Sequence, residues 1–310
     1  MRLPRRSRSA LAWRVLFSLS SLGGAACGAP EPTATSTGSP QLAHVPDLTG
    51  LPDLIVDRAT LATSWVIYEE FLSATACDVI EGDVTPGPHR TLRITVNTPN
   101  IGDADLFVGD PNAHWDPNGD GSGADSDGLF ELASCHRHFH FRNYATYELF
   151  PVNADGSLGD VVESAKRGFC MIDVAPYQVP GLPPKAWVYR SCGAIGRRGN
   201  QGIATGWADQ YFKWLQGQYF VIDGLPAGKY MIRIHVNPPF TPAGGEPCPH
   251  VDGDGFCHQL PESDFTNNVA EIFLQIPAGR PGKTGFGPGG GQELPPNKDA
   301  LIDDEKRVTK

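Results

Sequence analysis

The segment Cys135-His136-Arg137-His138-Phe139-His140 places three of the chain's nine histidines on alternate positions beside a cysteine. Alternation sends all three rings to one face if the segment is a β-strand. Imidazole is a common ligand of copper, zinc, iron and nickel, so the pattern predicts a transition-metal site. At about 3.3 Å per residue the outer Cα atoms lie about 13 Å apart, so one ion can collect all three rings only where the strand bends or twists. The alternative is a solvated surface strand.

The sequence around this segment has a predominantly β pattern. It contains 36 Gly and 28 Pro in 310 residues, with 40% hydrophobic and 19% charged residues, which is typical of a globular protein with many turns. Short alternating runs bounded by Gly, Pro, Asn or Asp predict a mainly β protein, an antiparallel β-sandwich with long irregular loops and little helix. The predicted strands are Asp53–Val56, Thr63–Leu72, Thr91–Val96, Cys135–Leu149, Phe169–Val174, Tyr219–Ile222, Lys229–Val236 and Val269–Ile276.

The N-terminus has the pattern of an export signal. Five arginines precede the apolar run Val15-Leu16-Phe17, which is too short to span a membrane, and small residues lead to Cys27. Cys27 resembles the lipid-acceptor cysteine of a bacterial lipoprotein, and simple secretion is the alternative. We therefore expect an exported protein, either secreted or held at the cell envelope by a lipid on Cys27. Residues 1–27 would be the signal peptide and 28–48 a flexible linker.

Charge and cysteine content limit the partners and the compartment. The net charge of −10 argues against nucleic acid or an anionic membrane surface as a partner and weakly favours cationic partners. Apart from Cys27 there are six cysteines, an even number that predicts disulfides in an exported chain. Cys248 and Cys257 are close enough in sequence for a local bridge. The spacing leaves the other pairings open.

Four separated motifs, taken in order, resemble the catalytic domain of the lysyl oxidase family. Cys135–His140 resembles the copper-binding run of that family, and Lys166-Arg167-Gly168-Phe169-Cys170 resembles the segment whose lysine becomes part of the cofactor. The stretch from Gly202 to Tyr211 resembles the segment with the cofactor tyrosine, and Glu262–Asn268 resembles the calcium-binding end. The resemblance therefore implies a lysyl oxidase-like catalytic domain over residues 49–277. The Gly/Pro-rich and charged composition of residues 278–310 predicts a disordered tail.

The resemblance also implies a copper-dependent amine oxidase. Ordinary side chains cannot accept two electrons reversibly, so oxidation of an amine needs a cofactor. In the family this is lysyl tyrosylquinone, whose precursors here would be Lys166 and Tyr211, with copper held by His136, His138 and His140. The implied substrate is a primary amine, either a lysine in a protein or a small molecule. It would be converted to an aldehyde while O2 is consumed and hydrogen peroxide and ammonia are released.

The identity of the catalytic base stays open at this point. Vertebrate members of the family carry an acidic residue and a further histidine after the last copper histidine, where this chain has Asn143 and Thr146. Asp209, two residues before Tyr211, is a candidate base. The alternative role for Asp209 is to fix the geometry of its loop.

The resemblance further implies a disulfide between Cys135 and Cys192, which leaves Cys77 to pair with Cys170. It also implies a calcium ion that joins the two ends of the domain through oxygen ligands, as hard cations require. The implied calcium ligands are Asp53, the Leu54 carbonyl, Glu262, Asp264, Asn267 and Asn268. The alternative is that Glu262–Asn268 is a plain polar turn before the last strand.

Two other functions compete with the oxidase. The chain could be a non-enzymatic extracellular module, a β-sandwich that binds calcium and copper without making the quinone. A metal-dependent hydrolase that uses bound water is the third alternative. It is disfavoured because no carboxylate lies at a spacing tied to the histidines.

Overall fold

Alternating apolar residues build the largest sheet of the protein. The computed structural model describes residues 47–164, 166, 168–182 and 186–294. In it, β7 (Ala145–Pro151), β8 (Val162–Glu163), β13 (Gly228–Val236) and β16 (Val269–Ile276) form an antiparallel sheet in the order β16-β13-β7-β8. On β13 and β16 alternate side chains such as Ile232, Ile234 and Ile272 are buried. This alternation gives the sheet one face that packs on the core.

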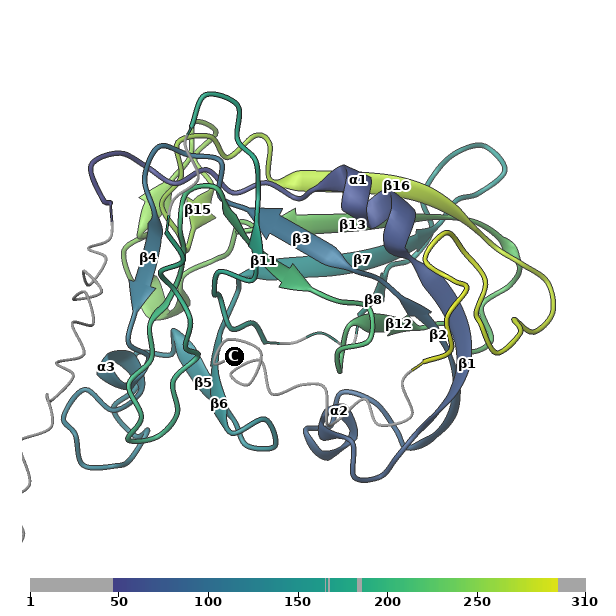
Figure 1. Ribbon diagram of the computed structural model, residues 1–310, viewed down its shortest axis with the longest axis horizontal. Helices are drawn as coiled ribbons and strands as arrows, with labels where there is room; N and C mark the ends of the chain where they lie inside the picture. Colours follow the sequence, from purple (N-terminus) through teal and green to yellow (C-terminus); the bar gives the residue numbers. More distant parts are fainter. Residues whose placement is uncertain (1–46, 165, 167, 183–185, 295–310) are drawn as a thin grey trace, which may run out of the picture. The chain divides into compact units, whose positions relative to one another are not determined.

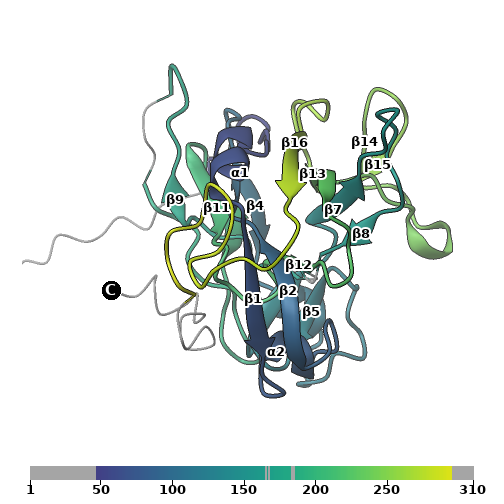
Figure 2. The same ribbon diagram turned by 90° about the vertical axis from the view of Figure 1, so that its right-hand side faces the viewer.

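Two further sheets cover that face. One contains β1 (Val66–Leu72), β2 (Gly87–Arg93) and β12 (Tyr219–Val221), and the other contains β3 (Val96–Pro99), β9 (Ala175–Pro176) and β11 (Trp207–Tyr211). Their inward residues, including Leu92, Val96 and Phe220, join Leu149 and Ile232 of the first sheet in one apolar core. Figure 2 shows these layers edge-on. The predicted fold, mainly β with antiparallel sheets and little helix, is confirmed.

The shorter strands and helices lie within the long connections, mainly at the ends of the sheets (Figure 1). Three two-stranded antiparallel pairs are present in the described residues: β4 with β10, β5 with β6, and β14 with β15. Their bounds are Leu106–Gly109 (β4), Gln201–Ile203 (β10), Phe130–Ala133 (β5), His138–Phe141 (β6), His250–Val251 (β14) and Cys257–His258 (β15). The helices are α1 (Arg58–Ser64), α2 (Cys77–Ile80), α3 (Asn112–Trp115) and a 3₁₀ turn, Ala243–Gly245.

The structure differs from five of the eight predicted strands, and one of them, Thr91–Val96, spans the end of β2 and the start of β3. The predicted strand Thr63–Leu72 begins inside helix α1, where the Asp57 side chain accepts the N–H groups of Ala59 and Thr60 and caps the helix. The predicted strand Cys135–Leu149 is two strands, because the chain turns between β6 and β7 with Asn143 at a φ of 57°. The predicted strands Asp53–Val56 and Phe169–Val174 contain only isolated bridges, Leu54 to Asn100 and Phe169 to Phe141.

Part of the predicted disordered tail contacts the sheet. Phe286 exchanges two backbone hydrogen bonds with Ile67 of β1, of 2.8 and 3.0 Å, and the Tyr68 hydroxyl donates to the Gln292 carbonyl. The predicted signal peptide, Cys27 and most of the predicted linker lie outside the described residues, as do residues 295–310. Within the described residues, no helix has the length and apolar character needed to cross a membrane.

Candidate active site

The three histidines converge because the chain bends where their run begins. His138 and His140 lie on β6, which pairs with β5 so that Ala133 faces His138. His136 precedes the strand in a turn, and between it and His138 Arg137 adopts a φ of 61°. The ring centroids are 4.9 to 5.6 Å apart in all three pairs. The bend that the sequence required is therefore present, at Arg137.

The spacing of two of these rings fits a metal ion. The Nε2 atoms of His138 and His140 face each other at 3.1 Å. Two imidazole nitrogens bound to one ion at about 2.0–2.1 Å, with an angle between a right angle and a tetrahedral one, lie about 2.9–3.4 Å apart. Among the described residues, no three His, Cys, Asp or Glu side chains form a complete metal-ligand group. The histidines are thus a pair with ligand spacing and a third ring beside it.

Burial keeps one of these imidazoles in the form that can bind a metal. His140 lies in a desolvated position close to His138, Lys166 and His136, and burial first and these charges second hold its pKa well below its usual range. His140 is therefore neutral at neutral pH. A neutral ring has a nitrogen lone pair to donate, whereas a protonated ring has none.

The lysine segment runs directly against the histidine strand. The Phe141 N–H donates to the Phe169 carbonyl at 2.6 Å, which forms an isolated bridge between the two segments. Gly168 lies on the ring of His140, and a Cβ added there would be 2.1 Å from His140 Nδ1. A glycine is needed here because any side chain would displace that ring.

Lys166 and Tyr211 meet although they are far apart in the sequence. The Lys166 Nζ lies 4.2 Å from the centroid of the Tyr211 ring and 5.1 Å from that of Phe169. Tyr211 ends β11, is buried, packs edge-on against Phe169 with centroids 5.4 Å apart, and donates its hydroxyl to the Cys170 carbonyl at 2.9 Å. The predicted cofactor pair is therefore in contact, beside the histidines.

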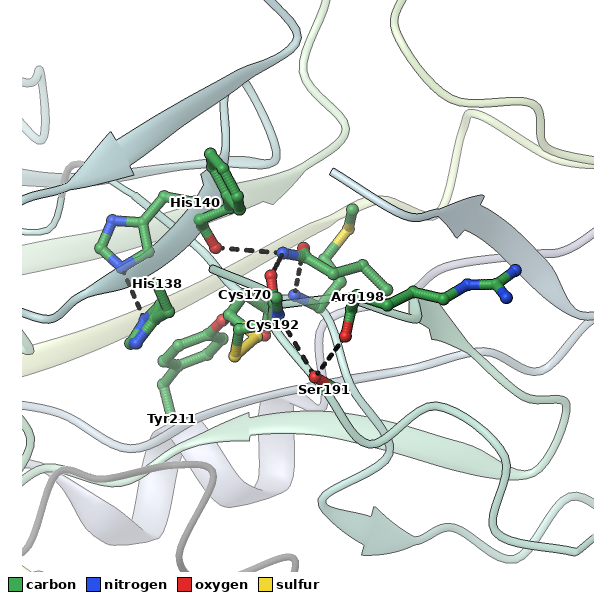
Figure 3. Close-up of a disulfide and its surroundings, with 11 residues drawn as sticks. His138, His140, Cys170, Ser191, Cys192, Arg198 and Tyr211 are labelled. Carbon is green, nitrogen blue, oxygen red and sulfur yellow. Dashed lines mark hydrogen bonds between the residues drawn. A yellow bond between two sulfur atoms is a disulfide. The ribbon is translucent and has the colours of Figure 1, made fainter. Parts of the chain in front are cut away.

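One buried glutamine fixes the surrounding backbone. Gln201 donates through Nε2 to the carbonyls of Phe139 and Cys192, at 3.0 and 2.9 Å, and accepts the Met171 N–H at 3.1 Å. These bonds join the histidine strand, the lysine segment and the segment at Cys192. Figure 3 shows His138 and His140 facing each other, with Tyr211 beside the Cys170–Cys192 disulfide.

The disulfides correct two of the predicted pairings. The bridges are Cys77–Cys135 and Cys170–Cys192, each with Cα atoms 5.3 Å apart, and Cys248–Cys257. The local bridge Cys248–Cys257 is confirmed. The predicted bridges Cys135–Cys192 and Cys77–Cys170 are wrong, because the segment after Cys192 aligns with Phe139 through a Gly193 carbonyl bond rather than with Cys135. Cys135 instead lies in the turn that faces α2.

Asp209 is buried on the same strand as Tyr211. It lies two positions before Tyr211 on β11, so the two side chains share a face of the strand. Burial and, second, the Asp209 charge raise the pKa of Tyr144 well above its usual range, so the carboxylate lies close to that phenol. Asp209 is not among the described residues that line the cavity at the histidines.

That cavity has a volume of about 590 Å³ and an acidic lining. His136, His138, His140 and Lys166 open into it. Its carboxylates are Asp78, Glu81, Asp83 and Glu131. The cavity can therefore admit a small or extended cation to the histidines and the lysine.

Most of the predicted calcium ligands also come together. The Asn267 amide donates to Asp53 Oδ1 at 2.9 Å, and Glu262 accepts the Leu54 N–H at 2.7 Å and the Asn268 amide at 2.8 Å. The buried Oδ1 atoms of Asn267 and Asn268 have no hydrogen-bond partner among the described residues. Asp264 bonds to Thr266 instead. The cluster thus joins Asp53 to the end of the domain and contains amide oxygens suited to a cation.

Several residues of the site gave no signal in the sequence. Glu81, which contacts His136, lies far from the histidine run, and nothing in its neighbourhood indicated the contact. Gln201 also lacked a signal. Gly168 lay inside the recognised lysine motif, where a glycine beside an aromatic residue could have indicated a close approach.

The chain is similar in sequence to known lysyl oxidases. The family model described as lysyl oxidase matches residues 55–245. The chain is 26% identical to lysyl oxidase homolog 2 of Rattus norvegicus over 76% of its own length and 24% of that protein. It is 25% identical to protein-lysine 6-oxidase of Homo sapiens over 73% of its length and 46% of that protein. The chain therefore spans less than half the length of these relatives.

Proposed function

Because the chain belongs to the lysyl oxidase family, we propose that it is a copper-dependent amine oxidase that converts primary amines to aldehydes with release of hydrogen peroxide and ammonia. The observation that carries this proposal is the contact of the Lys166 Nζ with the Tyr211 ring, 4.2 Å from its centroid, beside three histidines. Since protein-lysine 6-oxidase is among the relatives, a lysine in a protein is one proposed substrate class. Small primary amines are the other.

In this proposal His136, His138 and His140 hold copper, and Lys166 and Tyr211 form lysyl tyrosylquinone. When present, the metal and the quinone supply the two-electron chemistry that side chains lack. The fit of the 3.1 Å pair of Nε2 atoms to one ion supports the metal, and the proximity of Lys166 to Tyr211 supports the cross-link.

The residues of the cavity have tasks of their own. The carboxylates Asp83 and Glu131 attract the ammonium form of the amine to the cavity. Phe169 and the Cys170 carbonyl hold the tyrosine ring and its hydroxyl. For Asp209 we propose a positioning role, because its buried carboxylate lies close to the Tyr144 phenol and its backbone carbonyl accepts the Thr98 hydroxyl at 3.1 Å.

Two further proposals concern the compartment and calcium. We propose that the protein is exported, because its three disulfides are typical of proteins that fold in an oxidising compartment. We propose that calcium binds between Asp53 and the Glu262–Asn268 segment. The buried amide oxygens of Asn267 and Asn268, which lack hydrogen-bond partners in the described structure, support this site.

The oxidase proposal is tested on protein matured with copper and O2. Mass spectrometry should find a peptide that links Lys166 to Tyr211, redox staining should detect a quinone, and primary amines should yield hydrogen peroxide. A Tyr211→Phe protein should still bind copper but produce no peroxide above background, because the ring then lacks the oxygen from which the quinone is built.

The control is Tyr230→Phe. Tyr230 is also buried and also donates its hydroxyl to a backbone carbonyl, that of Pro226 at 2.9 Å, but it lies outside the site. Its activity should equal that of the wild type. If copper binds while Lys166 and Tyr211 stay unmodified, the non-enzymatic binding module replaces the oxidase.

A further inference from the structure

Glu81 connects helix α2 to the first histidine. It follows the helix directly and lines the same cavity as the three imidazoles. One carboxylate oxygen, Oε1, accepts the Cys135 N–H at 3.0 Å, and the other, Oε2, lies 3.2 Å from His136 Nδ1. The Glu81 side chain is 20% exposed and that of His136 is 14% exposed. The contact is thus between two largely buried groups.

The position of this carboxylate is fixed from both ends of α2. Cys77, at the start of the helix, forms the disulfide with Cys135, the residue beside His136. Asp78 is buried and accepts the Tyr219 hydroxyl from β12 and the Gly217 N–H from the loop that lines the cavity. The Glu81 N–H closes the helix on the Cys77 carbonyl at 2.8 Å. Glu81 therefore lacks the freedom of a surface side chain.

An ionised carboxylate can only accept hydrogen bonds, and this decides the proton position on the imidazole. The His136 Nδ1 is buried and has no well-aligned acceptor, so a small ring rotation toward Oε2 would satisfy it. With the proton on Nδ1, the lone pair is on Nε2. His138 and His140 already direct their Nε2 atoms at each other, so all three rings would then offer the same nitrogen.

We infer that Glu81 is the positioning residue of the metal site, which selects the Nδ1–H tautomer of His136 and so makes its Nε2 the third ligand. This inference rests on the proposed copper site. Carboxylates that hold the second nitrogen of a metal-bound histidine raise the basicity of that ligand and fix its ring. The Cys77–Cys135 bridge keeps Glu81 and His136 in register.

The test is Glu81→Gln. The glutamine carbonyl can still accept the Cys135 N–H, but its amide now donates to Nδ1 and favours the opposite tautomer, in which Nε2 carries the proton. Copper affinity is measured by competition with a chelator in a Tyr211→Phe background, where no quinone forms. We expect a loss of about 10- to 100-fold. In metal-free protein, NMR of ¹⁵N-labelled imidazoles should show His136 changing from Nδ1–H to Nε2–H.

The control is Glu131→Gln, which removes the same charge from the same cavity without a contact to His136 in the described structure. It should lower the affinity much less. Equal losses in the two variants, or no loss in Glu81→Gln, would overturn the inference. If wild-type protein binds no copper, the proposed function fails, while the tautomer in metal-free protein still decides the role of Glu81. If Glu81→Gln does not fold, the wild-type protein still tests the inference. An Nε2–H tautomer of His136 in metal-free wild type would refute the role inferred for Glu81.

Discussion

At the scale of single residues, the site depends on contacts that exclude even a methyl group. Gly168 lies on the His140 ring, and its backbone is not in the left-handed region. An alanine at this position would therefore clash with the ring but would not strain the backbone. Arg137 does occupy that region, with a φ of 61°, and so bends the histidine run. The sequence therefore supplies the histidine side chains, and the backbone at Arg137 and Gly168 lets their rings come together.

Gly168→Ala should therefore displace His140. A Cβ 2.1 Å from Nδ1 forces the ring away from His138, so copper affinity should fall and overpacking should cost about 1–3 kcal/mol of stability. Chelator competition and denaturant unfolding measure the two effects. The control is Gly228→Ala on β13, where an added Cβ meets nothing within 4 Å. Wild-type copper affinity in Gly168→Ala would contradict the assigned contact.

At the scale of elements, buried polar groups join segments that the sequence separates. Asp173 is fully buried, and its carboxylate accepts the N–H groups of Val188, Tyr189 and Ala204, at 2.8 to 3.0 Å.

Predicted strands at Lys229–Val236 and Val269–Ile276 were found almost as expected because their alternation is regular. Helix α1 was missed although Asp57 at its N-cap was a visible signal, since the β-branched residues around it favoured a strand.

We expect the Asp173 carboxyl to make the free energy of unfolding depend on pH. Burial raises its pKa to about 6 from 3.8, so between these values the folded state retains a proton that the unfolded state releases. Its contribution to the free energy of unfolding therefore falls as pH rises from about 4 to 6, by about 3 kcal/mol, and is constant above. An Asp173→Asn protein has no carboxyl at this position, so its free energy of unfolding does not fall in this way as the pH rises.

Denaturant unfolding of both proteins from pH 4 to 7 measures the effect. The difference between variant and wild type cancels all other titrating groups. It should shift by about 3 kcal/mol in favour of the variant across this window. Parallel curves would show that Asp173 does not titrate there.

At the scale of the whole molecule, the two ends of the described domain meet. The contacts of Asp53 with Asn267 and of Leu54 with Glu262 span more than 200 positions of the chain. Burial raises the pKa of Glu262 to about 8, and its partners include the amides of Asn237 and Asn268. A cation at this junction would stabilise the ionised carboxylate and hold both ends together.

Calcium should therefore raise the thermal stability of copper-free protein. At a concentration about 100 times the dissociation constant, the gain is about 2.7 kcal/mol. Glu262→Gln should abolish this gain, whereas Glu246→Gln, an exposed residue of the preceding loop, should retain it. Melting temperatures with calcium and with a chelator measure it. Equal melting temperatures in the wild type would argue for the plain polar turn.

The sequence by itself determined the β pattern, the separate histidine, lysine and tyrosine motifs of the site and the bridge Cys248–Cys257, because each single strand, motif or bridge consists of residues close together in the chain. Tertiary structure alone decided that Cys77 pairs with Cys135, that Lys166 lies over Tyr211 and that Glu81 meets His136. Short-range spacing follows from backbone geometry, which a strand or turn fixes locally. Contacts between distant segments depend on how whole sheets and loops pack, and no local pattern encodes that.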